Sequence, residues 1–579
     1  MVLKLRDPDD ILYALGDPGK FQVIQIILLA WQFLPTGVND LMPIFYNFQP
    51  IGIRLTNDSA YNTSEVLNIT AACQLNRNEF DYVYPANQWS IIGDMDLVCD
   101  RKWLADFAST IYFLGQVLGS PVVGFCSDRY GRRPTLIWFN AVFTVLNIGL
   151  IFSRDIVSFI VIGFFVGVAR QAFGTAFVVI AIEWIQPKRR ALWWSIAQFP
   201  LSLAVPVLAL AAYLLPNWHY LQIFVALSNF TAVTFYWFAP ESLKWLMLNN
   251  RMKLPAELFP GLEKMAGDIQ ARRQNSKPPS AIDCFRTTYV RTFTLMSCYL
   301  WFAVCCTYFT LSFLLTKMTG DIYINLTISG CLELIPRIFS VAVAMKVTNR
   351  ASLTGYYTVA GILAIAAGSL TGASLGPTKT GLALVGRMAI SGCFPVIGVL
   401  CNELLPTAAR NSGIAWCSVF MRIGGMVAPQ LVLLTSALAF KGVPYLIVGI
   451  VSIIAAGITV ILPETSDMKL LTTVEEMEKF GAQELFAFYR RKSVAVLTFL
   501  KTARPSVVLH RASMAIPRLS MAVPKSEHSV AARDHPMSVI RKTSRVSDTL
   551  HASTSEHGGR TNPAFLLESR SDANLVGED

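Results

Sequence analysis

A dense group of charges interrupts an otherwise apolar part of the chain at Gly124–Pro134, which reads GFCSDRYGRRP. Asp128, Arg129, Arg132 and Arg133 fall within six residues. The flanking segments, LADFASTIYFLGQVLGSPVVGF and TLIWFNAVFTVLNIGLIF, are apolar, and each is about long enough to cross the hydrocarbon core of a bilayer. A charged hairpin between two such segments predicts a pair of antiparallel membrane-spanning helices.

The composition of the whole chain agrees with a membrane protein. Its 579 residues are 53% hydrophobic and only 15% charged, and the mean hydropathy is +0.46. Soluble domains carry roughly 25% charged residues. The net charge of +11 is therefore interpreted as a topology signal. No stripe of Lys and Arg interleaved with aromatic residues indicates nucleic-acid binding.

Apolar segments of spanning length recur twelve times along the chain, which predicts twelve transmembrane helices. Loops after even-numbered segments carry several Lys and Arg residues, whereas loops after odd-numbered segments carry one or none, apart from the long first loop. Because basic residues are enriched in cytosolic loops, we expect both termini in the cytosol. The segments are 21–43, 104–127, 135–153, 157–183, 191–214, 219–239, 292–316, 322–346, 353–374, 381–404, 412–437 and 443–462.

The long loop at 45–103 is expected outside the cell. It contains three glycosylation sequons, at Asn57, Asn62 and Asn68. Of the 11 cysteines in the chain, only Cys73 and Cys99 fall in this loop, which allows one disulfide in an oxidising compartment.

Similar residues recur at the cytosolic ends of even-numbered segments with a nearly constant spacing. Three pairs lie 220, 223 and 221 residues apart: Glu183 and Glu403, Glu241 and Glu464, and Arg129 and Arg350. A repeated unit of six spans preserves orientation, so the two halves are predicted to be parallel repeats. Such a bundle holds its substrate cavity between the halves and rocks them for alternating access.

These patterns predict an all-α polytopic membrane protein with two six-helix bundles. From residue 463 a tail rich in Ser, Arg and Lys is expected to lack a packed core. Its basic residues before Ser are typical of kinase sites, although they also suit contact with anionic lipid, which we prefer. The expected parts are a cytosolic N-terminus at 1–20, bundles at 21–240 and 292–462, a cytosolic linker at 241–291 and a cytosolic tail at 463–579.

The charged hairpin GFCSDRYGRRP resembles the signature loop of the major facilitator superfamily. Four further motifs are similar to its organic cation/anion/zwitterion transporter family, most like the organic anion branch, and the resemblance covers about residues 1–470. It implies the major facilitator fold, a plasma-membrane location, no enzyme activity and no cofactor or metal. The motifs lie at Asn87–Trp103, Leu215–Gln222, Pro240–Leu246 and Asn402–Asn411.

The same resemblance implies that the charged hairpin is a gate. Asp128 is expected to dock at the cytosolic end of segment 412–437, where a helix N-terminus is positive, and so to lock the outward-open state. Gly131 is expected to permit the tight turn and Gly124 a close approach of helices. The expected gating residues are Asp128, Arg129, Gly131, Arg132, Arg133, Glu183, Arg190, Glu403 and Arg410.

Charges inside the spans indicate the sign of the substrate, because each costs roughly 3 kcal/mol on insertion scales. Arg422 lies halfway along segment 412–437, where by resemblance cation carriers have Asp and anion carriers Arg. When this segment is aligned with anion carriers at Gly330, Arg337 falls on the position where they have Lys. When it is aligned at Pro336, Arg337 falls one residue away from that position. We expect Arg422 and Arg337 to bind an organic anion. The alternative for Arg337 is an ion pair with Glu333, one helical turn away.

Two further arginines, Arg170 and Arg387, lie in the predicted spans. Arg170 is interpreted as a cavity charge or as half of an ion pair with Asp40 across two helices, and the pair is preferred. For Arg387 a structural role is expected.

Aromatic residues of segment 292–316 are the remaining binding candidates. Trp301 anchors a motif that resembles relatives in which the following aromatic pair, here Tyr308 and Phe309, lines the pocket. Aromatic faces suit bulky organic ions. For any single one of them, lipid contact or helix packing is the preferred explanation.

The sequence therefore predicts a secondary-active or facilitative transporter of small organic ions, with anions favoured and a counter-substrate or coupling ion as a further partner. No nucleotide-binding Gly-x-x-x-x-Gly-Lys-[Ser/Thr] loop and no hydrolytic triad are present in the sequence. The alternatives are a cation or zwitterion carrier, or a receptor or scaffold that kept the fold without transport.

Overall fold

The computed structural model describes residues 19–56, 66–84, 88–183, 185, 193, 196–230, 241–242, 245–246, 249, 283–346, 348–438, 440–464 and 474–481. All twelve predicted spans contain helices within these ranges. Nine helices in the described part of the chain are long and apolar enough to cross a membrane. The chain is therefore a multi-pass membrane protein, as the sequence predicts.

The first half begins with a broken helix. Its three pieces, α2, α3 and α4, are separated at Gln32 and Met42, whose backbone N–H groups each donate to the oxygen three residues earlier. Pro43 lies in the first turn of α4, where a missing N–H is tolerated. The other spans of this half are mostly single helices. Their bounds are α2 (Lys20–Trp31), α3 (Phe33–Leu41), α4 (Pro43–Tyr46), α6 (Trp103–Tyr130), α7 (Arg132–Ile151), α8 (Ile156–Glu183), α10 (Phe199–Leu214) and α11 (Trp218–Phe230).

The second half repeats this arrangement, and its fourth span is divided in two at Gly392. The described bounds are α15 (Thr288–Leu314), α16 (Ile322–Lys346), α17 (Asn349–Ser369), α18 (Gly376–Ser391), α19 (Cys393–Leu404), α20 (Thr407–Ala437) and α21 (Val443–Ile461).

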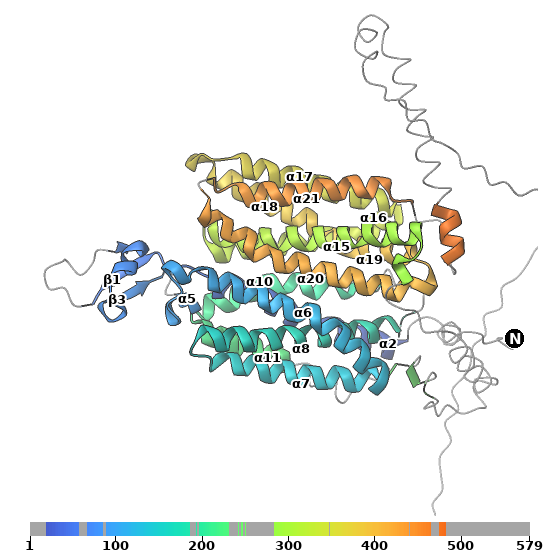
Figure 1. Ribbon diagram of the computed structural model, residues 1–579, viewed down its shortest axis with the longest axis horizontal. Helices are drawn as coiled ribbons and strands as arrows, with labels where there is room; N and C mark the ends of the chain where they lie inside the picture. Colours follow the sequence, from blue (N-terminus) through green and yellow to red (C-terminus); the bar gives the residue numbers. More distant parts are fainter. Residues whose placement is uncertain are drawn as a thin grey trace, which may run out of the picture. The chain divides into compact units, whose positions relative to one another are not determined.

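The two halves meet through two equivalent helix pairs. Helix α6, the second span, packs against α20, the eleventh, and α10, the fifth, packs against α16, the eighth (Figure 1). Exchanging the halves maps the second span onto the eighth and the eleventh onto the fifth, so each pair is converted into the other. This is the packing expected of parallel repeats related by an axis along the membrane normal.

A small antiparallel sheet stands at one end of the bundle, which we call the sheet end (Figure 1). Its strands are β1 (Gly52–Leu55), β2 (Leu67–Asn68) and β3 (Phe80–Val83) in the order β2-β1-β3. They surround a separate apolar cluster, and the short helix α5 (Ile91–Asp94) follows. Cys73 and Cys99 form a disulfide in this region, with their Cα atoms 5.8 Å apart.

The opposite end carries the charged hairpin and is called the hairpin end. Helix α6 stops at Gly131, whose φ of +110° is a conformation that L side chains rarely adopt. Glu241 Oε1 then accepts hydrogen bonds from the backbone N–H groups of Arg132, at 2.9 Å, and Arg133, at 3.2 Å. A carboxylate at this position stabilises the positive N-terminus of α7.

The expected role of Gly124 was wrong. A Cβ atom at Gly124 would have nothing within 4 Å, whereas one at Gly115 would collide with the carbonyl oxygen of Phe164. A Cβ at Gly119 would lie 2.5 Å from the carbonyl oxygen of Val168. The close contact of α6 with α8 is therefore made by the two earlier glycines.

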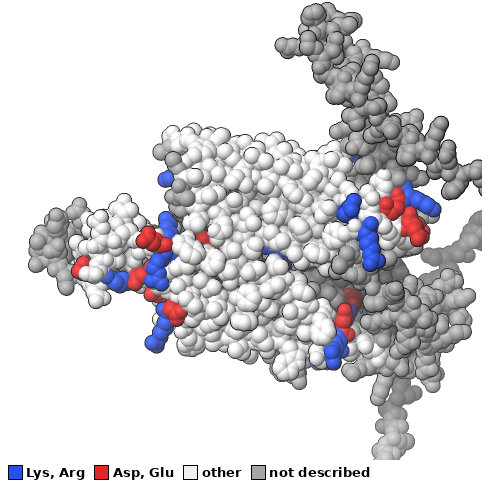
Figure 2. Space-filling model, viewed as in Figure 1, with Lys and Arg blue, Asp and Glu red and all other residues white. Residues whose placement is uncertain are grey.

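Charged residues gather at the two ends, with an almost uncharged belt between them (Figure 2). Large apolar side chains of the spanning helices, such as Val145 of α7 and Leu210 of α10, are exposed. In water such surfaces would be costly, but they suit the hydrocarbon core of a bilayer.

Most of the predicted linker and nearly all of the predicted tail lie outside the described residues, including the kinase-like sites. Residues 474–481 are described and helical. Glu478 Oε1 accepts from the backbone N–H groups of Tyr289, at 2.8 Å, and Val290, at 3.1 Å, and Met477 is fully buried. These eight residues pack against the start of α15, so the expectation of an unpacked tail does not hold for them.

We predict that Gly131→Ala lowers the apparent melting temperature of the purified protein in detergent. The backbone angles of Gly131, φ +110° and ψ +161°, lie in a region that costs an L residue about 1–3 kcal/mol, and the new Cβ would lie 2.5 Å from Glu241 Oε2. The matched control is Gly124→Ala, which replaces a helical glycine in open space and should leave the melting temperature unchanged or slightly higher. Equal melting temperatures for the two variants would contradict this account of the hairpin.

Candidate functional site

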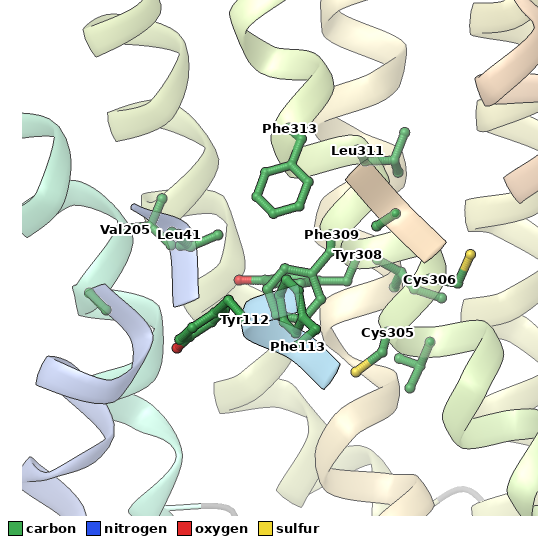
Figure 3. Close-up of a cluster of buried hydrophobic side chains, with 14 of the residues drawn as sticks. Leu41, Tyr112, Phe113, Val205, Cys305, Cys306, Tyr308, Phe309, Leu311 and Phe313 are labelled. Carbon is green, nitrogen blue, oxygen red and sulfur yellow. The ribbon is translucent and has the colours of Figure 1, made fainter. Parts of the chain in front are cut away.

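Aromatic side chains from both halves meet in the middle of the bundle (Figure 3). Tyr112 and Phe113 come from α6, and Tyr308 and Phe309 come from α15. The rings of Phe113 and Phe309 lie 5.0 Å apart at 64°, and those of Tyr308 and Phe309 lie 5.4 Å apart at 85°. Edge-to-face packing of this kind is favourable between aromatic rings. It brings the predicted pair Tyr308 and Phe309 to the boundary between the halves.

In the first half a buried carboxylate holds a buried arginine. Asp40 of α3 pairs with Arg170 of α8, which is the cross-helix pair preferred from the sequence. The carboxylate also accepts hydrogen bonds from the Tyr112 hydroxyl, at 2.7 Å, and from the Gln116 amide, at 3.0 Å. A buried ion pair is stable only when the remaining polar atoms are also satisfied, and Tyr112 and Gln116 provide this for Asp40.

A ladder of polar side chains continues from this pair between the helices. The Asn39 amide donates to Asn147 Oδ1 at 2.9 Å, and the Gln222 amide donates to the same oxygen at 2.8 Å. The Tyr46 hydroxyl in turn contacts Gln222. Sequence reasoning did not assemble this network, although polar residues inside apolar segments were its visible signal.

The second half contains an equivalent charge cluster. One carboxylate oxygen of Glu333, on α16, pairs with Arg387 of α18. The other oxygen of Glu333 lies 3.6 Å from Arg337 Nη2. The Tyr308 hydroxyl donates to Glu333 at 3.3 Å, and the Arg387 guanidinium lies over the Tyr308 ring, 4.6 Å from its centroid. Arg387 also donates to Ser312 and Ser329. It therefore has the structural role expected for it.

Arg337 is only partly satisfied by its partners. Besides the contact with Glu333, its Nη1 atom donates to the backbone oxygen and side-chain oxygen of Gln198, at 3.3 and 3.2 Å. Its Nε and Nη2 atoms are buried and have no hydrogen-bond partner among the described residues. The ion pair with Glu333 is thus present, and it leaves donors unused.

Arg422 of α20 lies near the first-half pair. Its charge interacts with those of Asp40 and Arg170, but the Asp40 carboxylate is already paired with Arg170. The Arg422 Nε atom is buried without a hydrogen-bond partner in the described part of the chain. Because buried donors are normally paired, the unpaired nitrogens make Arg422 and Arg337 candidates for binding an absent ligand. Arg170 also has an unpaired Nε, but its charge is compensated by Asp40.

The predicted aromatic candidates share one neighbour. Phe394 of α19 lies edge-on to Tyr308 at 5.5 Å and at 6.4 Å from Trp301. Sequence reasoning missed Phe394, since a phenylalanine in an apolar segment carries no signal of its own. Trp301 is half-buried and further from the charge clusters than Tyr308.

At the hairpin end, Asp128 does not contact the start of α20 in this structure. Its side chain is 68% exposed and pairs with Arg132, one helical turn later, at 2.9 Å. Arg132 Nε also lies 3.4 Å from Glu183 at the end of α8. The predicted latch is therefore not formed here, and its role in another conformation stays a prediction.

The second half has a similar contact at the same end. The Asn349 amide, at the start of α17, donates to Glu403 at 3.1 Å. This is the equivalent of the first-half contact between Arg132, at the start of α7, and Glu183. Arg410 Nε donates to the backbone oxygen of Leu405 at 3.3 Å. Arg129 lies over the rings of Phe125 and Tyr130.

Several predicted residues fall elsewhere. Arg190, Asn57 and Asn62 lie outside the described residues. Asn68 is exposed at the end of β2, and its side chain accepts from the backbone N–H of Thr70 at 3.3 Å.

A cavity lies between the halves near the sheet end. Lys102 and Asp106 of the first half line one side, and Thr316 and Lys317 of the second half line the other. Its free volume is about 30 Å³, which suits water but is far below the roughly 300 Å³ of a ligand pocket. This cavity is therefore too small to hold an organic ion.

Comparison with known proteins places these features in a family context. A profile of the Major Facilitator Superfamily matches residues 102–385. Solute carrier family 22 member 6-A of Xenopus laevis is 30% identical over 530 residues, which cover 81% of this chain and 94% of that protein. Solute carrier family 22 member 3 of Mus musculus is 29% identical, covering 72% of this chain and 77% of the relative.

Two more similarities are informative. Organic anion transporter 3 of Mus musculus is 24% identical over 519 residues, covering 82% of this chain and 95% of the relative. Among solved structures, the inward-open xylose transporter XylE from E. coli aligns with a TM-score of 0.57 at 15% identity, covering 79% of this chain and 99% of that one. At this identity the structural similarity shows the fold alone.

We predict that Asp40→Asn strongly destabilises the protein, because it leaves Arg170 buried without a counter-charge. Breaking a buried ion pair costs about 3–5 kcal/mol. The measurement is the yield of monodisperse protein in detergent together with its melting temperature. The double variant Asp40→Asn/Arg170→Gln should recover part of the loss, and Asp81→Asn on an exposed position of β3 is the control. A single Asp40→Asn variant as stable as the unmodified protein would contradict the assignment.

Proposed function

The chain belongs to solute carrier family 22, the organic cation and anion transporters of the major facilitator superfamily, and we propose that it is a carrier of organic anions. As a member of this family it is no enzyme, and it moves small organic ions by alternating access. The sign of the substrate, its binding residues and the orientation in the membrane are the parts that we propose here.

The charge balance of the spanning helices is the observation that carries the anion assignment. Four arginines lie in the middle of the described spanning helices, away from the helix ends. Asp40 pairs with Arg170, and the single carboxylate of Glu333 is shared by Arg387 and Arg337. Two positive charges remain uncompensated inside the bundle. Charges at membrane depth are costly unless they are paired or functional, and an anionic substrate would supply the missing negative charge. The arginines are Arg170, Arg337, Arg387 and Arg422.

Arg422 and Arg337 are the proposed anion ligands. Both have buried guanidinium nitrogens without a hydrogen-bond partner among the described residues. A guanidinium presents its N–H groups as a planar fork that matches a carboxylate, and the resulting charge-assisted hydrogen bonds are strong. A carboxylate bound here would satisfy donors that the protein itself leaves open.

The aromatic cluster is proposed to receive the organic part of the substrate. Phe309 packs against Phe113 across the boundary between the halves. Tyr308 packs on Phe309, and Phe394 connects Tyr308 to Trp301. Flat apolar groups pack well on aromatic faces. A small organic anion with an aromatic or aliphatic body is thus the substrate class that fits both features.

We further propose that the sheet end faces the outside of the cell at the plasma membrane, with both termini cytosolic. The sequon at Asn68 and the Cys73–Cys99 disulfide belong to the sheet end, and glycans and disulfides form in the secretory pathway. The arginines of the charged hairpin lie at the other end, as expected for a cytosolic loop.

A cation carrier is the competing assignment, since an organic cation transporter-like protein of Drosophila melanogaster is 25% identical to this chain. Asp40 and Glu333 are the acids that a cation would need. Both are paired with arginines, so neither offers a free negative charge. A counter-substrate or coupling ion is a further proposed partner of the transport cycle.

The test is uptake by cells that express the unmodified protein and three variants, with labelled aromatic carboxylates, amines and zwitterions. Arg422→Gln should lower anion uptake about tenfold or more, because a hydrogen bond to a charged group contributes about 1.5–3 kcal/mol. Arg422→Lys should retain part of it, and the exposed Arg154→Gln should change nothing. Cation uptake by the unmodified protein that Arg422→Gln leaves intact would overturn the anion assignment. No uptake of any compound, with surface expression verified, would favour a receptor.

A second prediction concerns the hairpin end. Asp128 is exposed, and surface ion pairs contribute only about 0–1 kcal/mol, so Asp128→Asn should fold normally and reach the cell surface. If Asp128 locks the halves in the outward-open state, uptake should nevertheless fall several-fold. The measurement is the uptake rate divided by the surface amount from biotinylation, and an unchanged ratio would refute the latch.

A further inference from the structure

The loop that carries the small sheet is rigidly joined to the first half of the bundle. The backbone N–H of Trp89 donates to the oxygen of Pro216 at 2.8 Å, and the N–H of Trp218 donates to the oxygen of Trp89 at 3.1 Å. The Asp94 carboxylate accepts from the indole N–H groups of both tryptophans. These bonds fix the loop to the beginning of α11, so the loop moves with the first half.

The residue next to this anchor reaches the other half. Gln88 is almost fully buried, and its side-chain oxygen accepts a hydrogen bond from the hydroxyl of Tyr323. Tyr323 lies at the start of α16, which belongs to the second half. The sheet loop therefore touches both halves, by a fixed contact on one side and a single side-chain hydrogen bond on the other.

Tyr323 makes further contacts across the same boundary. Its ring stacks on Phe45 of α4 at 6.2 Å and 19°, and meets Tyr213 of α10 edge-on at 5.5 Å and 80°. Thus one second-half side chain is held by three first-half partners, which come from the sheet loop, α4 and α10. Of this group, Gln88 alone lies in a motif named from the sequence, Asn87–Trp103.

We propose that Tyr323 is the gate residue of the sheet end, and that the sheet loop is a working part of this gate because Gln88 holds Tyr323 in the closed position. Alternating access requires the two halves to separate at each end in turn. Separation at the sheet end must break the hydrogen bond to Gln88 and withdraw the Tyr323 ring from Phe45 and Tyr213. The loop then contributes to the free-energy difference between the closed and open states.

Neighbouring contacts agree with a closed gate in this structure. Thr110 of α6 donates to the backbone oxygen of Met426 at 3.4 Å, and Gln430 of α20 donates to Thr110 at 2.8 Å. The cavity beside them has room only for water. All of these contacts are side-chain contacts between two rigid halves, so they can break without unfolding either half.

The inference rests on alternating access, but not on the sign of the substrate. Its test therefore needs a readout that works even if no substrate is known. Thr316 is half-buried and lines the sheet-end cavity, so a cysteine there would react faster with a membrane-impermeant thiol reagent when that end is open. The rate of labelling of Thr316→Cys then reports the open fraction.

In the Thr316→Cys background, Tyr323→Ala should raise the labelling rate about tenfold or more, since it removes the hydrogen bond and both ring contacts. Tyr323→Phe and Gln88→Ala should each raise it about two- to tenfold, because each removes the hydrogen bond and keeps the ring. A labelling rate unchanged by all three variants would overturn the proposal. Equal effects of Tyr323→Ala and Tyr323→Phe would assign the gate to the hydrogen bond alone.

A covalent lock gives the second readout. Gln88 and Tyr323 meet at their side-chain ends, so their backbones are too far apart for a direct disulfide. The pair Gln88→Cys/Tyr323→Cys should instead be joined by a bifunctional methanethiosulfonate cross-linker. The cross-link should abolish uptake, and reduction should restore it. The control pair is Arg77→Cys/Asp96→Cys, which replaces an ion pair of 2.7 Å within the sheet loop and should leave uptake unchanged when cross-linked. Uptake that continues in the locked Gln88–Tyr323 pair would contradict the gate. If the protein transports nothing in any form, the labelling rates still decide the gate while the substrate assignment fails.

Discussion

The desolvation of arginine is the constraint on which the rest of this structure depends. Four guanidinium groups lie inside a bundle of the thickness of a bilayer, where an uncompensated charge costs several kcal/mol. Each half compensates one of them in a similar way. An arginine on the fourth span of the half, Arg170 or Arg387, pairs with a carboxylate on another span of the same half, Asp40 or Glu333. A tyrosine hydroxyl, of Tyr112 or Tyr308, donates to that carboxylate.

This compensation explains why each half can move as a unit. The ion pairs and their hydrogen bonds connect helices within a half and so rigidify it. Contacts between the halves are of another kind: aromatic rings such as Phe113 and Phe309, small-residue packing such as Gly425 against Phe113, and few hydrogen bonds. Because strong interactions lie within the halves and weaker ones between them, the boundary between the halves is the place where the structure can open. The arginines left over after compensation lie near that boundary.

The sequence predicts the architecture well because the membrane imposes a simple pattern. Each span must pair its backbone N–H and C=O groups within its own helix and needs about 20 mostly apolar residues to cross the bilayer. Such a segment is visible in the sequence, and α16 accordingly has the predicted bounds 322–346. The pair of Asp40 and Arg170 could also be predicted, because few other acids are available at that depth. The direction of side chains could not. Gly124 and Gly119 look alike in sequence, but only Gly119 faces a neighbouring helix. Phe394 and Tyr323 were invisible for the same reason, since apolar and aromatic residues are common in every span.

Direct binding to the purified protein tests the central claim, that the uncompensated arginines select an anion. The measurement is the melting temperature of the protein in detergent with an aromatic carboxylate or with the amine that has the same ring. A ligand that binds only the folded state raises this temperature in proportion to the logarithm of its concentration above Kd. The account predicts a rise with the carboxylate alone, and loss of that rise in Arg422→Gln. A rise with the amine alone would contradict it.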